Sequence, residues 1–129
     1  MNEIFISLIQ QLKAQLSVDV FDHVPQDYNN FPYFRIEALP DSANDTDTES
    51  GFNSTFQINT WSEYRGSKEV GELQQQIYNA LHRWEMPDTA NYGVSQGPQQ
   101  TLKTVVINPD GITRQGVQRF QIYYEPLPI

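Results

Sequence analysis

The sequence predicts an α+β fold, in which a mainly antiparallel β-sheet packs against two α-helices on one face. Three observations support this prediction. Two segments place apolar residues at the helical spacing of three and four positions, several others alternate apolar and polar residues as half-buried strands do, and clusters of turn-forming residues separate them. With 129 residues the chain has the size of one ordinary domain, so we expect a single domain over residues 1–129.

The first helix is expected near the start of the chain. Its apolar residues form one stripe of a 3.6-residue period, and these are Phe5, Leu8, Ile9, Leu12 and Leu16. The β-branched segment 18–22 then predicts a short strand. Turn residues predict a loop over residues 23–30.

Two long antiparallel strands are expected next, joined by an acidic loop. In the first strand Phe34, Ile36 and Ala38 alternate with charged residues, and Pro40 ends it. The second strand runs over residues 51–61. The loop between them carries four carboxylates and no large apolar side chain, which predicts a long solvated hairpin loop. The four acidic residues are Asp41, Asp45, Asp47 and Glu49.

The second helix is expected after Ser67, a plausible N-cap. Its buried stripe is predicted to consist of Val70, Leu73, Ile77, Leu81 and Trp84. Pro87 forces the helix to end before it. His82 lies near the negative end of this helix, and the simplest interpretation is a surface residue favoured by that position.

The last third of the sequence predicts further strands over residues 91–94, 101–107 and 113–125. The run Asn108-Pro109-Asp110-Gly111 predicts a tight turn between the last two. The apolar pattern shifts by one position between Val117 and Phe120, so we expect a β-bulge near Gly116.

Composition excludes several classes of function. Eight basic residues against sixteen acidic ones give a formal net charge of −8, which opposes binding to nucleic acid or to an anionic membrane. The chain has no cysteine, which removes disulfides, thiolate zinc sites and cysteine nucleophiles. No apolar run is long enough to span a bilayer, and the N-terminus lacks the features of a cleaved signal peptide.

No catalytic or metal-binding motif is found. His23 and His82 accompany no nucleophile motif, and no glycine pattern forms a phosphate cradle. Residues 45–51 alternate oxygen-bearing side chains as a calcium loop does, but Ser50 occupies the sixth position and Phe56 the twelfth, where glycine and glutamate are needed. We therefore expect no catalytic residues, no cofactor and no metal ion, and a protein that is not an enzyme.

Exposed aromatic and basic residues suggest an interface. Tyr64, Tyr123 and Tyr124 are not easily buried together, because neighbouring strand residues point to opposite faces of the sheet. The candidate subunit or partner interface consists of Tyr64, Arg65, Arg114, Arg119 and Tyr123. The alternative is that the tyrosines line the rim of the core with their hydroxyl groups in water.

The arrangement resembles the tail terminator (tail-completion) family of long-tailed bacteriophages over nearly the whole chain. The most specific part is a strand, 56–62, that ends in Trp61-Ser62 and is followed by the amphipathic helix containing residues 71–81. Upstream, residues 31–36 look like the family's Pro-Tyr strand, and residues 110–120 look like its last hairpin and strand. The long acidic insert between Pro40 and Gly51 is less typical.

The resemblance implies a structural virion protein, assembled in the host cytoplasm and located at the head-proximal end of the tail. Copies of the chain would form a ring, usually a hexamer, that stops polymerisation of the tail tube protein and offers a docking surface to a head-tail connector or stopper protein. DNA would only pass through the lumen, which acidic side chains would keep free of sticking. No membrane is involved.

The acidic loop is expected at the lumen or at an axial rim of such a ring, because four like charges per subunit cannot be buried between subunits. A solvated loop on the outer wall is the competing possibility. Two other functions stay open at this point: another neck or head-tail joining protein of the phage, and a small ligand-binding or enzymatic domain.

Overall fold

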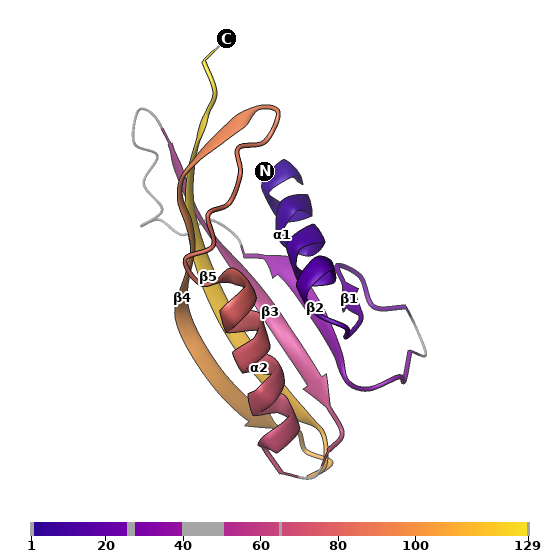
Figure 1. Ribbon diagram of the computed structural model, residues 1–129. Coiled ribbons are helices and arrows are strands. Elements are labelled where there is room, and N and C mark those ends of the chain that lie inside the picture. The colour runs from indigo at the N-terminus through magenta and orange to yellow at the C-terminus, as the bar shows by residue number, and fades with distance from the viewer. Residues whose placement is uncertain (1, 26–27, 40–50, 65, 129) are drawn as a thin grey trace.

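The computed structural model describes residues 2–25, 28–39, 51–64 and 66–128 (Figure 1). Its elements follow one another as α1 (Asn2–Gln15), β1 (Val20–Phe21), β2 (Tyr33–Ala38), β3 (Phe52–Ser62), α2 (Lys68–Leu81), β4 (Tyr92–Ile107) and β5 (Arg114–Pro126). The five strands form one sheet in the order β1-β2-β3-β5-β4. All neighbouring strands are antiparallel except β1 and β2, which confirms the predicted α+β class.

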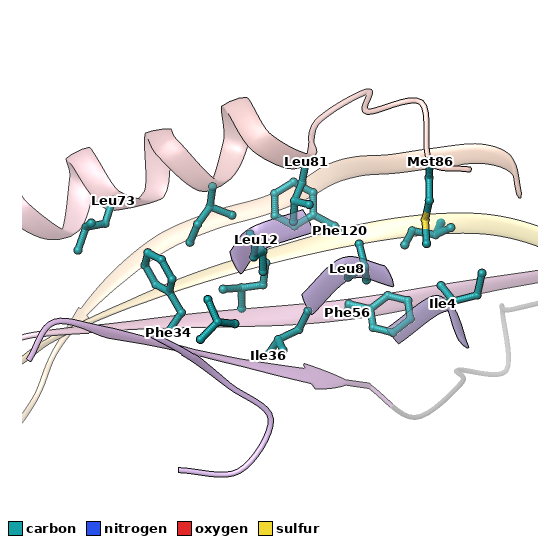
Figure 2. Packing of buried hydrophobic residues seen from close by; sticks show 14 of the residues in the cluster. Ile4, Leu8, Leu12, Phe34, Ile36, Phe56, Leu73, Leu81, Met86 and Phe120 are labelled. Carbon is teal, nitrogen blue, oxygen red and sulfur yellow. The ribbon is translucent and has the colours of Figure 1, made fainter. Parts of the chain in front are cut away.

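Both helices lie on the same face of the sheet, and the core fills the space between the helices and the sheet (Figures 1 and 2). The even-numbered residues of the central strands point into this space because successive strand residues alternate between the two faces. The buried strand residues are Phe34, Ile36, Phe56, Ile58, Phe120, Ile122 and Tyr124. No helix in the described residues is long and apolar enough to cross a membrane.

The stripe of α1 is shifted from the predicted one. Ile4, Leu8 and Leu12 are at most 1% exposed, whereas Phe5 and Ile9 are only partly buried at the margin of the core. Residues spaced by four positions therefore form the centre of the stripe, and Ile4 was missed because the prediction began at Phe5.

The predicted stripe of α2 is confirmed for Val70, Leu73, Ile77 and Leu81. Trp84 lies beyond the end of the helix at Leu81 and packs, partly buried, against the core. Ser67 precedes the helix, but its side chain makes no capping hydrogen bond. The helix also buries a residue that the apolar pattern did not indicate. Gln74 is completely buried, and its Nε2 donates to the backbone oxygen of Thr104 at 2.9 Å.

The region after α2 differs from the prediction. Where two short strands were expected, the structure has the single 16-residue strand β4 at the edge of the sheet. Its pairing with β5 shifts register at three places before Leu102, and Pro98 is tolerated there because an edge strand needs partners on one side only.

The predicted bulge near Gly116 is wrong. Strand β5 pairs with β3 in unbroken register from Arg114 to Tyr124. The apolar pattern appeared to shift because Gly116 and Gln118 are themselves buried on the core side. The Nε2 of Gln118 donates there to the backbone oxygen of Gln74 at 3.0 Å and to Oε1 of Gln100 at 2.9 Å, whereas its Oε1 has no hydrogen-bond partner among the described residues.

The predicted turn between β4 and β5 is confirmed. The Gly111 N–H donates to the Asn108 oxygen at 2.9 Å, and Gly111 adopts a φ of 73°, which an L side chain would disfavour. Asp110 closes the turn by accepting hydrogen bonds from the Ile112 and Thr113 N–H groups and from the Thr113 hydroxyl. These bonds, the hydroxyl first, lower the pKa of Asp110.

Candidate functional site

The sheet face opposite the helices carries the odd-numbered residues of the central strands, and no helix of the described chain covers it (Figure 1). A polar network crosses three strands on this face. We call it the amide network, and its members are Arg35, Glu37, Gln57, Asn59, Gln115 and Arg119.

Gln57 is at the centre of the amide network. Its Nε2 donates to Oε1 of Glu37 at 3.2 Å and to Oδ1 of Asn59 at 3.0 Å, and its Oε1 accepts from Nε of Arg119 at 3.0 Å. Gln115 also donates to Oδ1 of Asn59, at 3.2 Å, and Asn59 is only 3% exposed. The side chains are therefore held in place before any partner arrives, which reduces the entropy lost on binding.

This open face is electrically balanced, although the protein is strongly acidic. Among the odd-numbered residues of β2, β3 and β5, Arg35 and Arg119 are matched by Glu37 and Glu125, and the other side chains are neutral. Arg35 and Glu37 form an ion pair at 3.5 Å. A neutral surface of ordered amides can approach another acidic copy of the chain without the repulsion that the rest of the surface would cause.

The predicted interface residues fall into two groups. Arg119 and Tyr123 lie on the open face of β5, with Arg119 exposed. Tyr124 points to the core instead, is 4% exposed, and its hydroxyl lies 3.0 Å from that of Ser54. The two tyrosines therefore take opposite faces, as the alternation predicted.

The second group lies at the end of the sheet that contains the β4–β5 turn. Tyr64 is 51% exposed there. Arg114 is half-buried and donates through Nη1 to the backbone oxygens of Gly111 and Ile112. Arg65 lies outside the described residues, as do Asp41, Asp45, Asp47 and Glu49 of the acidic loop.

The histidines form no catalytic arrangement with the groups they contact. His23 is exposed in a loop. His82 is more than a surface residue at a helix end, because its Nδ1 accepts the N–H of Gln100 at 3.1 Å and its ring stacks on Tyr78. Across the parts of the chain that the structure describes, no three histidine or carboxylate side chains are grouped so that they could hold a metal ion.

The outer edge of β4 is closed in its first half. The Arg83 N–H donates to the Pro98 oxygen at 2.8 Å, and His82 accepts the Gln100 N–H, so the end of α2 occupies edge groups of the strand. From Leu102 to Ile107 the pairing with β5 is regular. Large apolar side chains are exposed in and beside this second half, and they are Leu102, Val106, Ile107 and Ile112.

The family model of the tail completion protein gp17 matches residues 7–125, which take in most of α1, all of α2 and the five strands except Pro126. The chain belongs to the tail completion protein gp17 family. The resemblance inferred from the strand ending in Trp61-Ser62 and the helix after it is confirmed at this level. As a member of this family, the protein is a structural component of a phage tail.

Solved structures share the fold of this tail completion protein. A chain in the virion of a native gene transfer agent particle superposes with a TM-score of 0.79 at 17% identity, covering 96% of each chain. The gp17 protein of bacteriophage SPP1 superposes with a TM-score of 0.56 at 17% identity, covering 94% of this chain and 88% of that one. A comparison with curated protein sequences finds no match.

Proposed function

We propose that the protein forms a homo-oligomeric ring, a hexamer by the family resemblance, at the head-proximal end of the phage tail tube. The ring stops addition of tail tube protein and presents a docking surface to a head-tail connector or stopper protein. DNA passes through its lumen and is not otherwise bound. The role is structural and not enzymatic.

The family match over residues 7–125 carries this proposal, because it spans α2, most of α1 and nearly the whole sheet rather than one motif. The surface of the protein supports it in two ways. The open sheet face offers an ordered, electrically balanced surface for protein contacts, and the strand edges on the two sides of the sheet leave backbone groups for a neighbouring subunit.

We place the acidic loop at the lumen or at an axial rim of the ring. Its test is neutralisation of Asp41, Asp45, Asp47 and Glu49 with Asn or Gln. The protein should fold normally, because exposed charges contribute about 0–1 kcal/mol each. Virions should assemble but show impaired DNA passage or head joining, whereas infectivity equal to that of the wild type would place the loop on the outer wall.

Negative-stain electron microscopy of the purified protein, alone and mixed with tail tubes, tests the ring. We expect ring-shaped particles that sit on one end of each tube. A protein that binds only the head connector would instead be a neck or joining protein. A monomer that binds neither structure would contradict an assembly role.

A further inference from the structure

We infer that the ring contact is made by strand addition, with the open second half of β4 in one subunit pairing antiparallel to β1 of the next. This inference rests on the proposed ring and names the surfaces that would join it. It follows from the backbone groups that the two sheet edges leave free, from their level along the sheet, and from their charges.

The open edge of β4 is identified by the alternation of an antiparallel pair, in which every second residue turns its backbone groups to the partner strand. The Asn108 N–H donates to the Thr113 oxygen, so Asn108 faces β5. Because the direction alternates along β4 from Asn108, the N–H and C=O groups of Ile107, Val105 and Lys103 point away from β5, to the outer edge of the sheet. Within the described residues these groups have no hydrogen-bond partner, in contrast to Pro98 and Gln100 earlier in the same strand.

The opposite edge of the sheet is β1, and it is open in the same way. The Phe34 N–H donates to the Asp19 oxygen at 2.9 Å, so Asp19 and Phe21 face β2 and Val20 turns its backbone groups outward. No described residue bonds to these groups of Val20. A strand laid beside β1 would therefore meet a free donor and a free acceptor.

The two edges lie at the same level along the sheet. One row of paired residues crosses it from edge to edge, and this row is Val105, Gly116, Thr60, Phe34 and Val20. Strand β1 runs in the direction of β2 and β5, and β4 runs opposite to them, so two subunits with the same orientation can pair β4 with β1 antiparallel. Contacts between unlike surfaces at the same level can close into a ring, whereas a rise at each contact would produce a helix.

Charge and shape are complementary when Val105 is set opposite Val20 of the next subunit. The open segment of β4, residues 101–107, has Lys103 and no carboxylate, whereas β1 is flanked by exposed Asp19 and Asp22. In this register Lys103 lies opposite Asp22. Ile107, which is 60% exposed, lies opposite Val18, which lines a hollow of about 350 Å³ between the end of α1 and β1. Lys13 and Leu16 form the helix side of that hollow.

Pairing of β4 with a second β4 through a twofold axis is the competing arrangement. It would also satisfy the outward backbone groups. However, it would set Lys103 opposite Ile107, leave β1 open, and give an isologous contact that cannot by itself close a ring of subunits in one orientation. The observed charges therefore favour β1 as the occupant.

Disulfide trapping tests the inference. The chain has no cysteine, so every disulfide must join introduced cysteines. Asp22→Cys and Lys103→Cys are both at exposed positions and should fold normally. Within one subunit they lie on opposite edges of the five-stranded sheet, about 19 Å apart at about 4.8 Å per strand, too far for a bond within the chain. Under mild oxidation a mixture of the two single variants should yield a covalent dimer, and a chain with both changes should yield a ladder of oligomers.

Each single variant alone should stay uncross-linked, and Lys68→Cys, an exposed lysine at the start of α2, should not cross-link with Asp22→Cys. In a parallel test Lys103→Glu and Asp22→Lys should each weaken assembly about tenfold or more, and the double variant should restore it. A covalent dimer in a mixture of Lys103→Cys and Ile107→Cys, the two positions that twofold pairing would set opposite each other, would overturn the inference in favour of β4–β4 pairing. Rings without cross-links in the mixture would overturn it but leave the proposed function standing, whereas the absence of rings even with tail tubes would defeat both.

Discussion

The close packing of α2 on β5 leads to a sharp prediction at Gly116. A Cβ atom at this position would lie 2.6 Å from Nε2 of Gln74 and 2.9 Å from Cγ2 of Val70. Both neighbours are completely buried and cannot move into solvent. Gly116→Ala should therefore force the Gln74 amide away from the Thr104 oxygen that it contacts at 2.9 Å.

The expected loss of stability is the sum of three contributions. Overpacking destabilises by about 1–3 kcal/mol, and the lost hydrogen bond adds about 0.5–1.5 kcal/mol. The reduced freedom of the unfolded chain offsets about 0.4–1 kcal/mol. Gly116→Ala should thus lower the free energy of unfolding by about 0.5–4 kcal/mol, and lower Tm by about 4 °C for each kcal/mol.

Denaturant unfolding followed by tryptophan fluorescence measures this change, with Gly71→Ala as the matched control. A Cβ atom at Gly71, inside α2, would meet nothing within 4 Å. That variant should gain about 0.5–1 kcal/mol, because glycine is unfavourable within a helix. In a background of Gln74→Ala the effect of Gly116→Ala should shrink, because the colliding amide is gone. If Gly116→Ala is as stable as the wild type, the packing of α2 described above is wrong.

Three further predictions concern the core, the turn and the open face. Leu73→Ala should lower the free energy of unfolding by about 2–5 kcal/mol in the same assay, and unchanged unfolding with failed partner binding would make the α2 stripe an interface. The pKa of Asp110 is lowered in the folded state, so its carboxylate stabilises the protein at any pH above its unfolded pKa of about 3.9. This contribution disappears as the pH falls through the lower pKa of the folded state. Asp110→Asn should therefore have a lower urea midpoint than the wild type at pH 7, and the two midpoints should converge in acid; a constant difference would contradict this account. Arg119→Ala should change stability by no more than about 0.5 kcal/mol but reduce assembly seen by light scattering, and unaltered assembly would remove Arg119 from the interface.

The sequence was sufficient for the fold class and for most element positions, because periodic apolar residues mark both helices and the central strands. Two of its errors share one physical origin. Gln74 and Gln118 are polar residues whose Nε2 groups find backbone acceptors inside the core, and sequence periodicity treats such residues as exposed. The apparent bulge near Gly116 arose in the same way.

The candidate surfaces were less accessible to sequence reasoning. The amide network joins β2, β3 and β5, so its contacts depend on strand register, which a single sequence does not specify. The closed half of β4 depends on His82 and Arg83 reaching an edge that lies more than a dozen residues later in the chain. The individual signals, exposed aromatic and basic residues, made Arg119 and Tyr64 interface candidates but gave no indication that they lie in different places.

The length of tail tubes made in the absence of this protein tests the central claim most directly. Electron micrographs of lysates from a phage with a nonsense codon in this gene would supply the measurement, with complementation by the wild-type chain as the control. The account predicts tubes that exceed the normal length, vary widely, and carry no heads. Tubes of uniform normal length in the mutant lysate would contradict the proposal that this protein ends tube polymerisation.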